Sequence, residues 1–171
     1  FAELPDARFV DCSGIVEAMR LVKSDAEIAT MRRAAVTTEA GMRAGIEAVA
    51  AGVSENDIAA EMQAVMTRAG SEYPAIAPFV ASGWRGAVGH ATWEGRIVEP
   101  GDTVFLELGG CVHRYHTAMM RTVVVGEPAP IVREAERVVR EAMAATMDAM
   151  KRGAVASAVD RVARTAIARG A

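Results

Sequence analysis

Apolar residues recur every three to four positions in four stretches of the chain, over residues 24–49, 54–69, 131–150 and 154–170. This period is typical of helices that bury one face. Ser24 begins the first stretch and Glu27 follows three residues later, a capping-box spacing that predicts a helix start. The apolar positions that we expect to be buried on this first helix are Ile28, Met31, Ala34, Ala35, Thr38, Met42 and Ile46. The pattern therefore predicts two pairs of helices, one before and one after the middle of the chain.

The middle of the chain has a different pattern, in which β-branched and apolar runs are separated by glycine and proline. Such runs are typical of strands, and they occur at residues 76–80, 103–108, 112–116 and 121–125. Pro100-Gly101-Asp102 predicts a turn before the second run, and Gly109-Gly110 predicts a turn after it. We expect a curved, mostly antiparallel sheet with the first helix pair on one face, and hence an α+β fold.

The two helix pairs resemble each other and indicate an internal repeat of helix, helix and sheet. The second copy has its two helices and no strands after them. We therefore expect the chain to be a fragment, with the later helices covered by a second copy, by residues outside the chain or by a swapped element. The alternative is a coincidence between two alanine-rich helix pairs. The apolar face in question carries Val138, Val139, Ala142, Val159, Val162 and Ile167.

Charge and composition narrow the class of protein. The 171 residues include 19 Lys and Arg against 22 Asp and Glu, spread along the chain. No basic stripe is present to contact phosphates, so nucleic acid is not an expected partner. The apolar runs fall far short of the roughly 20 residues of a membrane span. The first residues have no secretory pattern, and Cys12 and Cys111 have no CxxC spacing, so we expect a cytoplasmic protein.

His90 and Glu107 are the first candidates for chemistry. His90 follows Gly89 in a loop-like segment, where an exposed imidazole could transfer protons near neutral pH; the alternative is a surface or capping histidine. Glu107 is the one charged residue of an apolar strand, which predicts that it faces a cation, a metal or a polar cavity. The alternative is an edge-strand glutamate that points to water.

Three further residues of this region invite a functional interpretation. His113 and His116 have metal-pair spacing, but an odd separation places them on opposite faces of a strand, so we expect no shared metal. Arg121 could bind a carboxylate or form a structural ion pair.

Four motifs, taken together and in order, resemble the pita-bread superfamily of creatinase, aminopeptidase P, prolidase and methionine aminopeptidase. The family fold consists of two α/β halves related by a pseudo-twofold axis. The resemblance implies the first half plus the opening helices of the second half. It also implies that residues 1–20 end an N-terminal domain and its linker, and that residues 21–171 are part of the catalytic domain. The motifs are Met19 to Ile28, Gly89-His90, Pro100-Gly101-Asp102 leading into Glu107-Leu108-Gly109-Gly110, and Tyr115 to Arg121-Thr122.

The resemblance also bears on metal. Metallopeptidase members of the family use two aspartates in this stretch, eleven residues apart, and here Glu107 and Ala118 stand at those positions. Alanine has no ligand atom, so half of the bridging charge that a dinuclear site needs is missing. Creatinase, in the metal-free branch of the family, also has alanine there and uses a histidine that matches His90. We expect neither metal nor cofactor in this protein.

Within the metal-free branch, Glu-Leu-Gly-Gly-Cys with Arg-Tyr-His-Thr-Ala resembles the ectoine hydrolases, whereas Met120 replaces a creatinase glutamate. The resemblance implies a metal-independent hydrolase of a C–N bond in a small cationic amidine, which opens the ectoine ring. His90 would be catalytic, and Glu107, Tyr115 and His116 would bind the substrate. We expect a homodimer, and we expect this chain alone to be inactive. The alternatives are an Xaa-Pro metallopeptidase of the aminopeptidase P or prolidase type, and a non-catalytic binding module.

Overall fold

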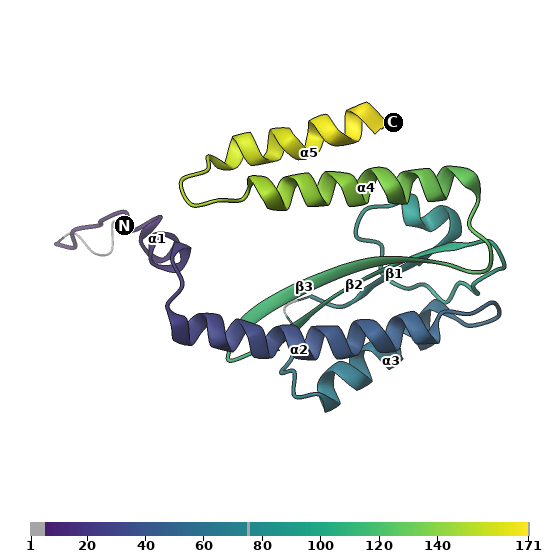
Figure 1. Cartoon of the computed structure of the whole chain (residues 1–171). Coiled ribbons are helices and arrows are strands. Elements are labelled where there is room, and N and C mark those ends of the chain that lie inside the picture. Colours follow the sequence, from purple (N-terminus) through teal and green to yellow (C-terminus); the bar gives the residue numbers. More distant parts are fainter. Residues whose placement is uncertain (1–5, 75, 171) are drawn as a thin grey trace.

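A three-stranded antiparallel sheet forms the centre of the molecule. The computed structural model describes residues 6–74 and 76–170. Strand β2 (Thr103–Val112) lies between β1 (Phe79–Ser82) and β3 (Tyr115–Val124), and the sheet curves along its length (Figure 1). The short 3₁₀ helix η1 (Gly83–Ala87) follows β1 directly.

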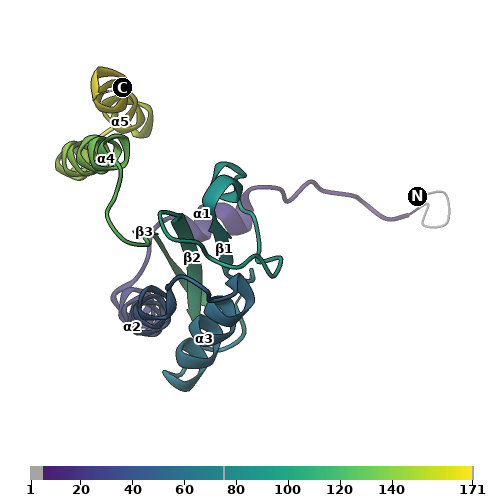
Figure 2. The same ribbon diagram turned by 90° about the vertical axis from the view of Figure 1, so that its right-hand side faces the viewer.

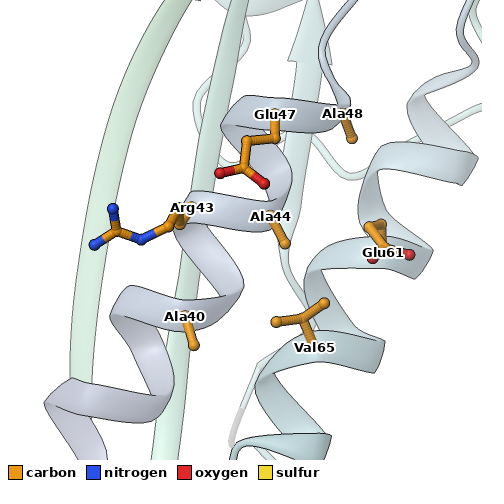
Figure 3. A pocket seen from close by; sticks show the side chains of 7 residues that line it. All are labelled: Ala40, Arg43, Ala44, Glu47, Ala48, Glu61 and Val65. Carbon is orange, nitrogen blue, oxygen red and sulfur yellow. The ribbon is translucent and has the colours of Figure 1, made fainter.

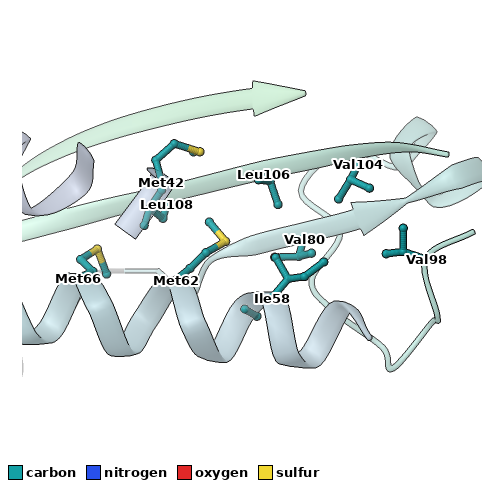
Figure 4. Close-up of a cluster of buried hydrophobic side chains, with 10 residues drawn as sticks. Met42, Ile58, Met62, Met66, Val80, Val98, Val104, Leu106 and Leu108 are labelled. Carbon is teal, nitrogen blue, oxygen red and sulfur yellow. The ribbon is translucent and has the colours of Figure 1, made fainter. Parts of the chain in front are cut away.

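Helices α2 (Asp25–Ala48) and α3 (Glu55–Arg68) cover one face of the sheet, as the sequence predicts. The capping box is present, because Ser24 Oγ accepts from the backbone N–H of Glu27 while the Glu27 carboxylate accepts from the N–H of Ser24. The core lies between these helices and the sheet (Figure 4). Its buried apolar side chains are Met42, Ile58, Ala59, Met62, Met66, Val80, Val98, Val104, Leu106 and Leu108.

The side chains of α2 that pack on the sheet are smaller than the apolar pattern of this helix predicts. Gly41 and Gly45 are buried, whereas Ile28 and Ile46 are 38% and 39% exposed. A β-carbon on Gly41 would lie 2.6 Å from Leu108 Cδ1. The helix approaches the sheet so closely at Gly41 and Gly45 that a side chain would clash there, and the predicted burial of Ile28, Ala35 and Ile46 is wrong.

The turn between β2 and β3 lies at His113-Arg114 and not at the predicted Gly109-Gly110. His113 and Arg114 both adopt left-handed backbone conformations, with φ of 49° and 64°, as a two-residue hairpin of this kind requires. The two glycines continue β2 in extended conformation, and Gly110 lies against α2. Consequently His113 belongs to the turn. The predicted strand at residues 103–108 continues to Val112 as β2, and residues 115–116 of the predicted strand at 112–116 begin β3.

Helices α4 (Pro130–Ala149) and α5 (Ala156–Gly170) form a second helix pair that packs mainly on itself. The pair stands off on the side of the sheet away from α2 and α3 (Figures 1 and 2). Val138 and Ala142 of α4 are buried, but Val139 and Ile167 are about half exposed. As expected, these helices have no sheet to cover within the described residues, and the nature of what covers them stays a prediction.

The N-terminal segment carries a short helix, α1 (Ile15–Leu21), which the sequence pattern did not predict. Residues 8–12 pair with no strand of the described chain. Residues 1–5 of the expected linker lie outside the described residues, and the boundary near residue 20 stays a prediction. No helix of the described part has the length and apolar character to cross a membrane.

Candidate functional site

The face of the sheet opposite α2 and α3 is open and carries the candidate site. Side chains alternate between the two faces of a strand. Thr117 Oγ1 lies 2.9 Å from Thr38 Oγ1 of α2, so Thr117 faces the helices. Its neighbours His116 and Ala118 therefore project from the open face, where both are exposed.

Glu107 lies in the middle of this open face. Its partner across to β1 is Phe79, and its partner across to β3 is Met120. The side chain is only 6% exposed, yet it makes no hydrogen bond or ion pair within the described residues. Its carboxylate oxygens still reach solvent, because no buried side-chain oxygen or nitrogen of the described residues lacks a hydrogen-bond partner. Because β2 is the central strand, the interpretation of Glu107 as an edge-strand glutamate is wrong, and the expectation that it faces a cation, a metal or a polar cavity stays a prediction.

His90 lies above the same region of the sheet. It is exposed, has a left-handed backbone with φ of 57°, and its ring centroid is 5.0 Å from that of Phe79. Because Phe79 is the cross-strand partner of Glu107, the structure brings the imidazole and the carboxylate to the same part of the open face. Phe79, which the sequence did not single out, connects them.

Ala118 is the diagonal neighbour of Glu107 across β2 and β3, since Gly109 pairs with Ala118 and Glu107 with Met120. Side chains in this relation are roughly 7–8 Å apart, a distance that two carboxylates bridging metal ions could span. The methyl group of Ala118 provides no donor atom, and no group of three His, Cys, Asp or Glu in the described chain could hold a metal ion. The donor set present here does not fit a dinuclear metal centre.

The two remaining predicted site residues lie elsewhere. His116 shares the open face but pairs with Cys111, four residues along β2 from Glu107, which is about 13 Å at the rise of a strand. Tyr115 lies on the opposite face, where its hydroxyl donates to Glu27 Oε1 of α2 at 2.7 Å. The structure therefore brings His90 and Glu107 together and brings neither Tyr115 nor His116 to them. Their role in binding substrate stays a prediction.

A polar cluster holds the β2–β3 turn beside His116. Glu72 accepts from the backbone N–H of His113 at 3.0 Å and pairs with Arg114 at 3.0 Å. The His113 N–H, followed by the charge of Arg114, keeps the pKa of Glu72 below its ordinary value in spite of partial desolvation. Arg114 also stacks on Tyr73, 3.8 Å from the ring centroid. The cluster stabilises a turn that lacks glycine.

Sequence reasoning missed a buried ion pair beside the His90 loop, which we define as residues 83–94. Glu55 in the first turn of α3 is fully buried and pairs with Arg85, which is also buried. Glu55 lies at the start of the predicted helix over residues 54–69, and the sequence pattern gave no sign of its burial. A charged pair at the base of the loop is the kind of contact that only the packing reveals.

A hollow of about 490 Å³ lies between α2 and α3, on the outer side of the helix layer (Figure 3). Ala40, Ala44 and Val65 face into it, and Arg43 pairs with Glu39 on the solvent side. It contains none of the predicted site residues and lies on the far side of the sheet from Glu107 and His116. The open sheet face, and not this hollow, is the candidate site.

Comparison with known proteins identifies the family. Residues 29–171 match metallopeptidase family M24, and the chain belongs to that family. An Xaa-Pro dipeptidase of Pyrococcus horikoshii is 32% identical over 160 residues, which cover 94% of this chain and 46% of that protein. The ectoine hydrolase of Halomonas elongata is 33% identical over 179 residues, which cover 99% of this chain and 43% of that protein.

Solved structures agree with this assignment. The X-Pro aminopeptidase of Thermotoga maritima superposes with a TM-score of 0.90 at 30% identity, covering 98% of this chain and 48% of that one. The prolidase of Pyrococcus furiosus gives a TM-score of 0.91 at 31% identity, with 94% and 48% covered. The predicted pita-bread fold is confirmed, and the chain spans about half the length of the relatives it matches.

Proposed function

We propose that the protein containing this chain hydrolyses a C–N bond in a small cationic amidine, and that its substrate is ectoine. The observation that carries the proposal is the setting of Glu107, a residue only 6% exposed whose carboxylate has no hydrogen-bond or ion-pair partner among the described residues and still reaches solvent. A delocalised amidinium is the type of cation that such a group binds, with both charge and N–H donors directed at the oxygens.

In this proposal, His90 is the catalytic acid and base. Its imidazole takes a proton from the attacking water and delivers one to the leaving nitrogen, so that the ring C–N bond breaks and a carbonyl forms. Its exposure and its place above Phe79 support this role. Glu107 holds the cation and stabilises the charge of the transition state. No step is assigned to a metal, because the alanine at position 118 removes one of the two carboxylates.

The proposed site is incomplete within this chain. Glu107 is the carboxylate that the described residues place on the open face beside Phe79, and further cation-binding groups would come from the other half of the family's catalytic domain. We therefore propose that this chain by itself is inactive. The homodimer expected from the resemblance also remains a proposal, which sedimentation of the full-length protein tests.

A second candidate is an Xaa-Pro dipeptidase, and the similarity to proteins with that name favours it. In that case the full-length protein would complete a metal site with residues outside the described chain. The two candidates differ in substrate and in their response to metal, so one set of assays separates them.

The test is steady-state kinetics of the full-length protein on ectoine, with creatine and an Xaa-Pro dipeptide as control substrates. His90→Ala should lower kcat by roughly 10²–10⁴-fold with a smaller effect on KM. Glu107→Gln should raise KM first, because it removes the charge that pairs with the cation. Added manganese, cobalt or zinc should leave the rate on ectoine unchanged.

Three results would count against the proposal. Near-normal turnover by His90→Ala would refute the mechanism. Cleavage of the dipeptide alone, stimulated by manganese, would replace ectoine with the dipeptidase candidate. A protein that turns over none of the three substrates but binds ectoine would be a binding module.

A further inference from the structure

We propose that Glu55 and Arg85 are positioning residues that hold the His90 loop in its working conformation; this inference rests on the proposed function of His90. The pair is hereafter the Glu55–Arg85 brace. The hydrogen bonds and ion pairs of the two residues go to Ser82, Thr92, Glu94 and to one another, so in this proposal each acts through the loop and not on the substrate.

The brace closes the loop at its base. Arg85 lies near the start of the loop, and its Nη2 donates to the carbonyl oxygen of Thr92 at 2.7 Å. Its Nη1 pairs with Glu55 Oε2. The same Glu55 oxygen accepts the backbone N–H of Glu94 at 3.2 Å. His90 thus lies within a segment whose two ends are tied to one another and to the same buried carboxylate.

The brace also fixes the loop to rigid elements. Glu55 Oε1 accepts from both the backbone N–H and the hydroxyl of Ser82, each at 2.7 Å, at the end of β1. Glu55 itself belongs to the first turn of α3. The loop is therefore anchored to a helix and to the strand that carries Phe79, the residue against which the His90 ring lies.

The Glu55–Arg85 ion pair is buried, unlike an ion pair on the protein surface. Glu55 is fully buried and Arg85 is 5% exposed, and every bond above joins the loop, β1 or α3. Arginine suits this place because its planar fork can donate to a carboxylate and a carbonyl at once, which an ammonium group does less well. A shift of about 1 Å in a catalytic group can lower the rate roughly 10²-fold. Loss of the two hydrogen bonds of the Arg85 guanidinium would let the His90 loop shift, and kcat would fall.

The mild perturbation is Arg85→Lys in the full-length protein, which keeps the charge beside Glu55 but loses the fork. We expect kcat on ectoine to fall roughly 10–100-fold with KM within twofold. Hydrogen–deuterium exchange, read by mass spectrometry, should rise in peptides covering residues 83–94. Should the lysine variant fail to fold, Glu55→Gln, which keeps an acceptor oxygen, is measured in the same way.

Arg96→Lys is the matched control. The Arg96 guanidinium donates to Ser82 Oγ at 2.7 Å and pairs with Asp102 and Glu99. It shares Ser82 with Glu55 but makes no hydrogen bond or ion pair with the residues of the His90 loop. It should lower the free energy of unfolding and leave kcat and exchange in residues 83–94 near wild type. A merely structural role for Arg85 predicts the same behaviour for both variants.

The outcomes separate this inference from the proposed function. Unchanged exchange in residues 83–94 of Arg85→Lys, or an equal loss of kcat in Arg96→Lys, overturns the brace. Wild-type protein without activity on ectoine overturns the proposed substrate; the brace is then judged by exchange, and by kcat on whichever control substrate is cleaved. A rise in exchange confined to Arg85→Lys supports the brace in either case.

Discussion

Replacing Gly110 by alanine tests how closely α2 approaches the sheet. Gly110 lies in β2 with ordinary extended backbone, so the substitution meets no conformational strain of its own. A β-carbon there would lie 2.2 Å from Thr37 Oγ1, 2.8 Å from Thr38 Oγ1 and 2.9 Å from the carbonyl oxygen of Ala34. Separations below 3.0 Å force either the side chains or the helix to move.

The cost follows from what must move. Thr38 Oγ1 accepts from the backbone N–H of Gly110 at 2.9 Å and also contacts Thr117 Oγ1 at 2.9 Å, so a rotation of Thr38 breaks buried hydrogen bonds. Overpacking costs about 1–3 kcal/mol, and a buried N–H left without an acceptor costs about the same. We expect Gly110→Ala to lower the free energy of unfolding by about 2–6 kcal/mol.

The assay is chemical denaturation followed by circular dichroism, with two further variants. Gly86→Ala is the control, because a β-carbon there has nothing within 4 Å, and its change should stay within about 0.5 kcal/mol. Thr37→Ala removes the nearest clashing atom, so the double variant with Gly110→Ala should recover at least about 0.5 kcal/mol relative to additivity. A loss no larger than that of Gly86→Ala, or strict additivity with Thr37→Ala, would refute the close approach.

Two further predictions concern charge. The backbone N–H of Ser24, then the hydroxyl of Tyr115, lower the pKa of Glu27 to about 2 from 4.5; this carboxylate therefore stabilises the fold above pH 4.5 and loses its contribution as the pH falls toward 2. Tyr115→Phe should raise the pKa of Glu27 and weaken this acid dependence, as measured by NMR titration of the carboxyl group, and an unmoved pKa would contradict the hydrogen bond. Ala118→Asp places a second carboxylate beside Glu107, so calorimetry should detect Mn²⁺ binding by the full-length variant and none by wild type; equal binding by both would contradict the reasoning.

Much of the local structure could be predicted from the sequence. The capping box at Ser24 and the apolar period identify α2, and the apolar period over residues 54–69 identifies α3. Local propensity and capping act over a few residues, so they are visible in the chain itself. The motif containing Gly89-His90 and the charged position in an apolar strand likewise marked His90 and Glu107 as candidates before any tertiary contact was known.

Long-range packing decided the rest. Gly109-Gly110 has the composition of a turn, but Gly110 serves the approach of α2, and the turn falls at His113-Arg114, where Glu72 accepts the His113 N–H. A glycine needed for close approach and a glycine needed for a turn look the same in a sequence, because the partner that distinguishes them lies far along the chain.

The site shows the same division. The sequence by itself determined the family, the helix pairs and the two residues on which the proposed chemistry depends. Only the tertiary structure decided that Phe79 joins His90 to Glu107, that Tyr115 faces α2, and that a fully buried Glu55 ties down the His90 loop. The physical reason is that strand register and burial depend on contacts between segments tens of residues apart, which no local pattern encodes.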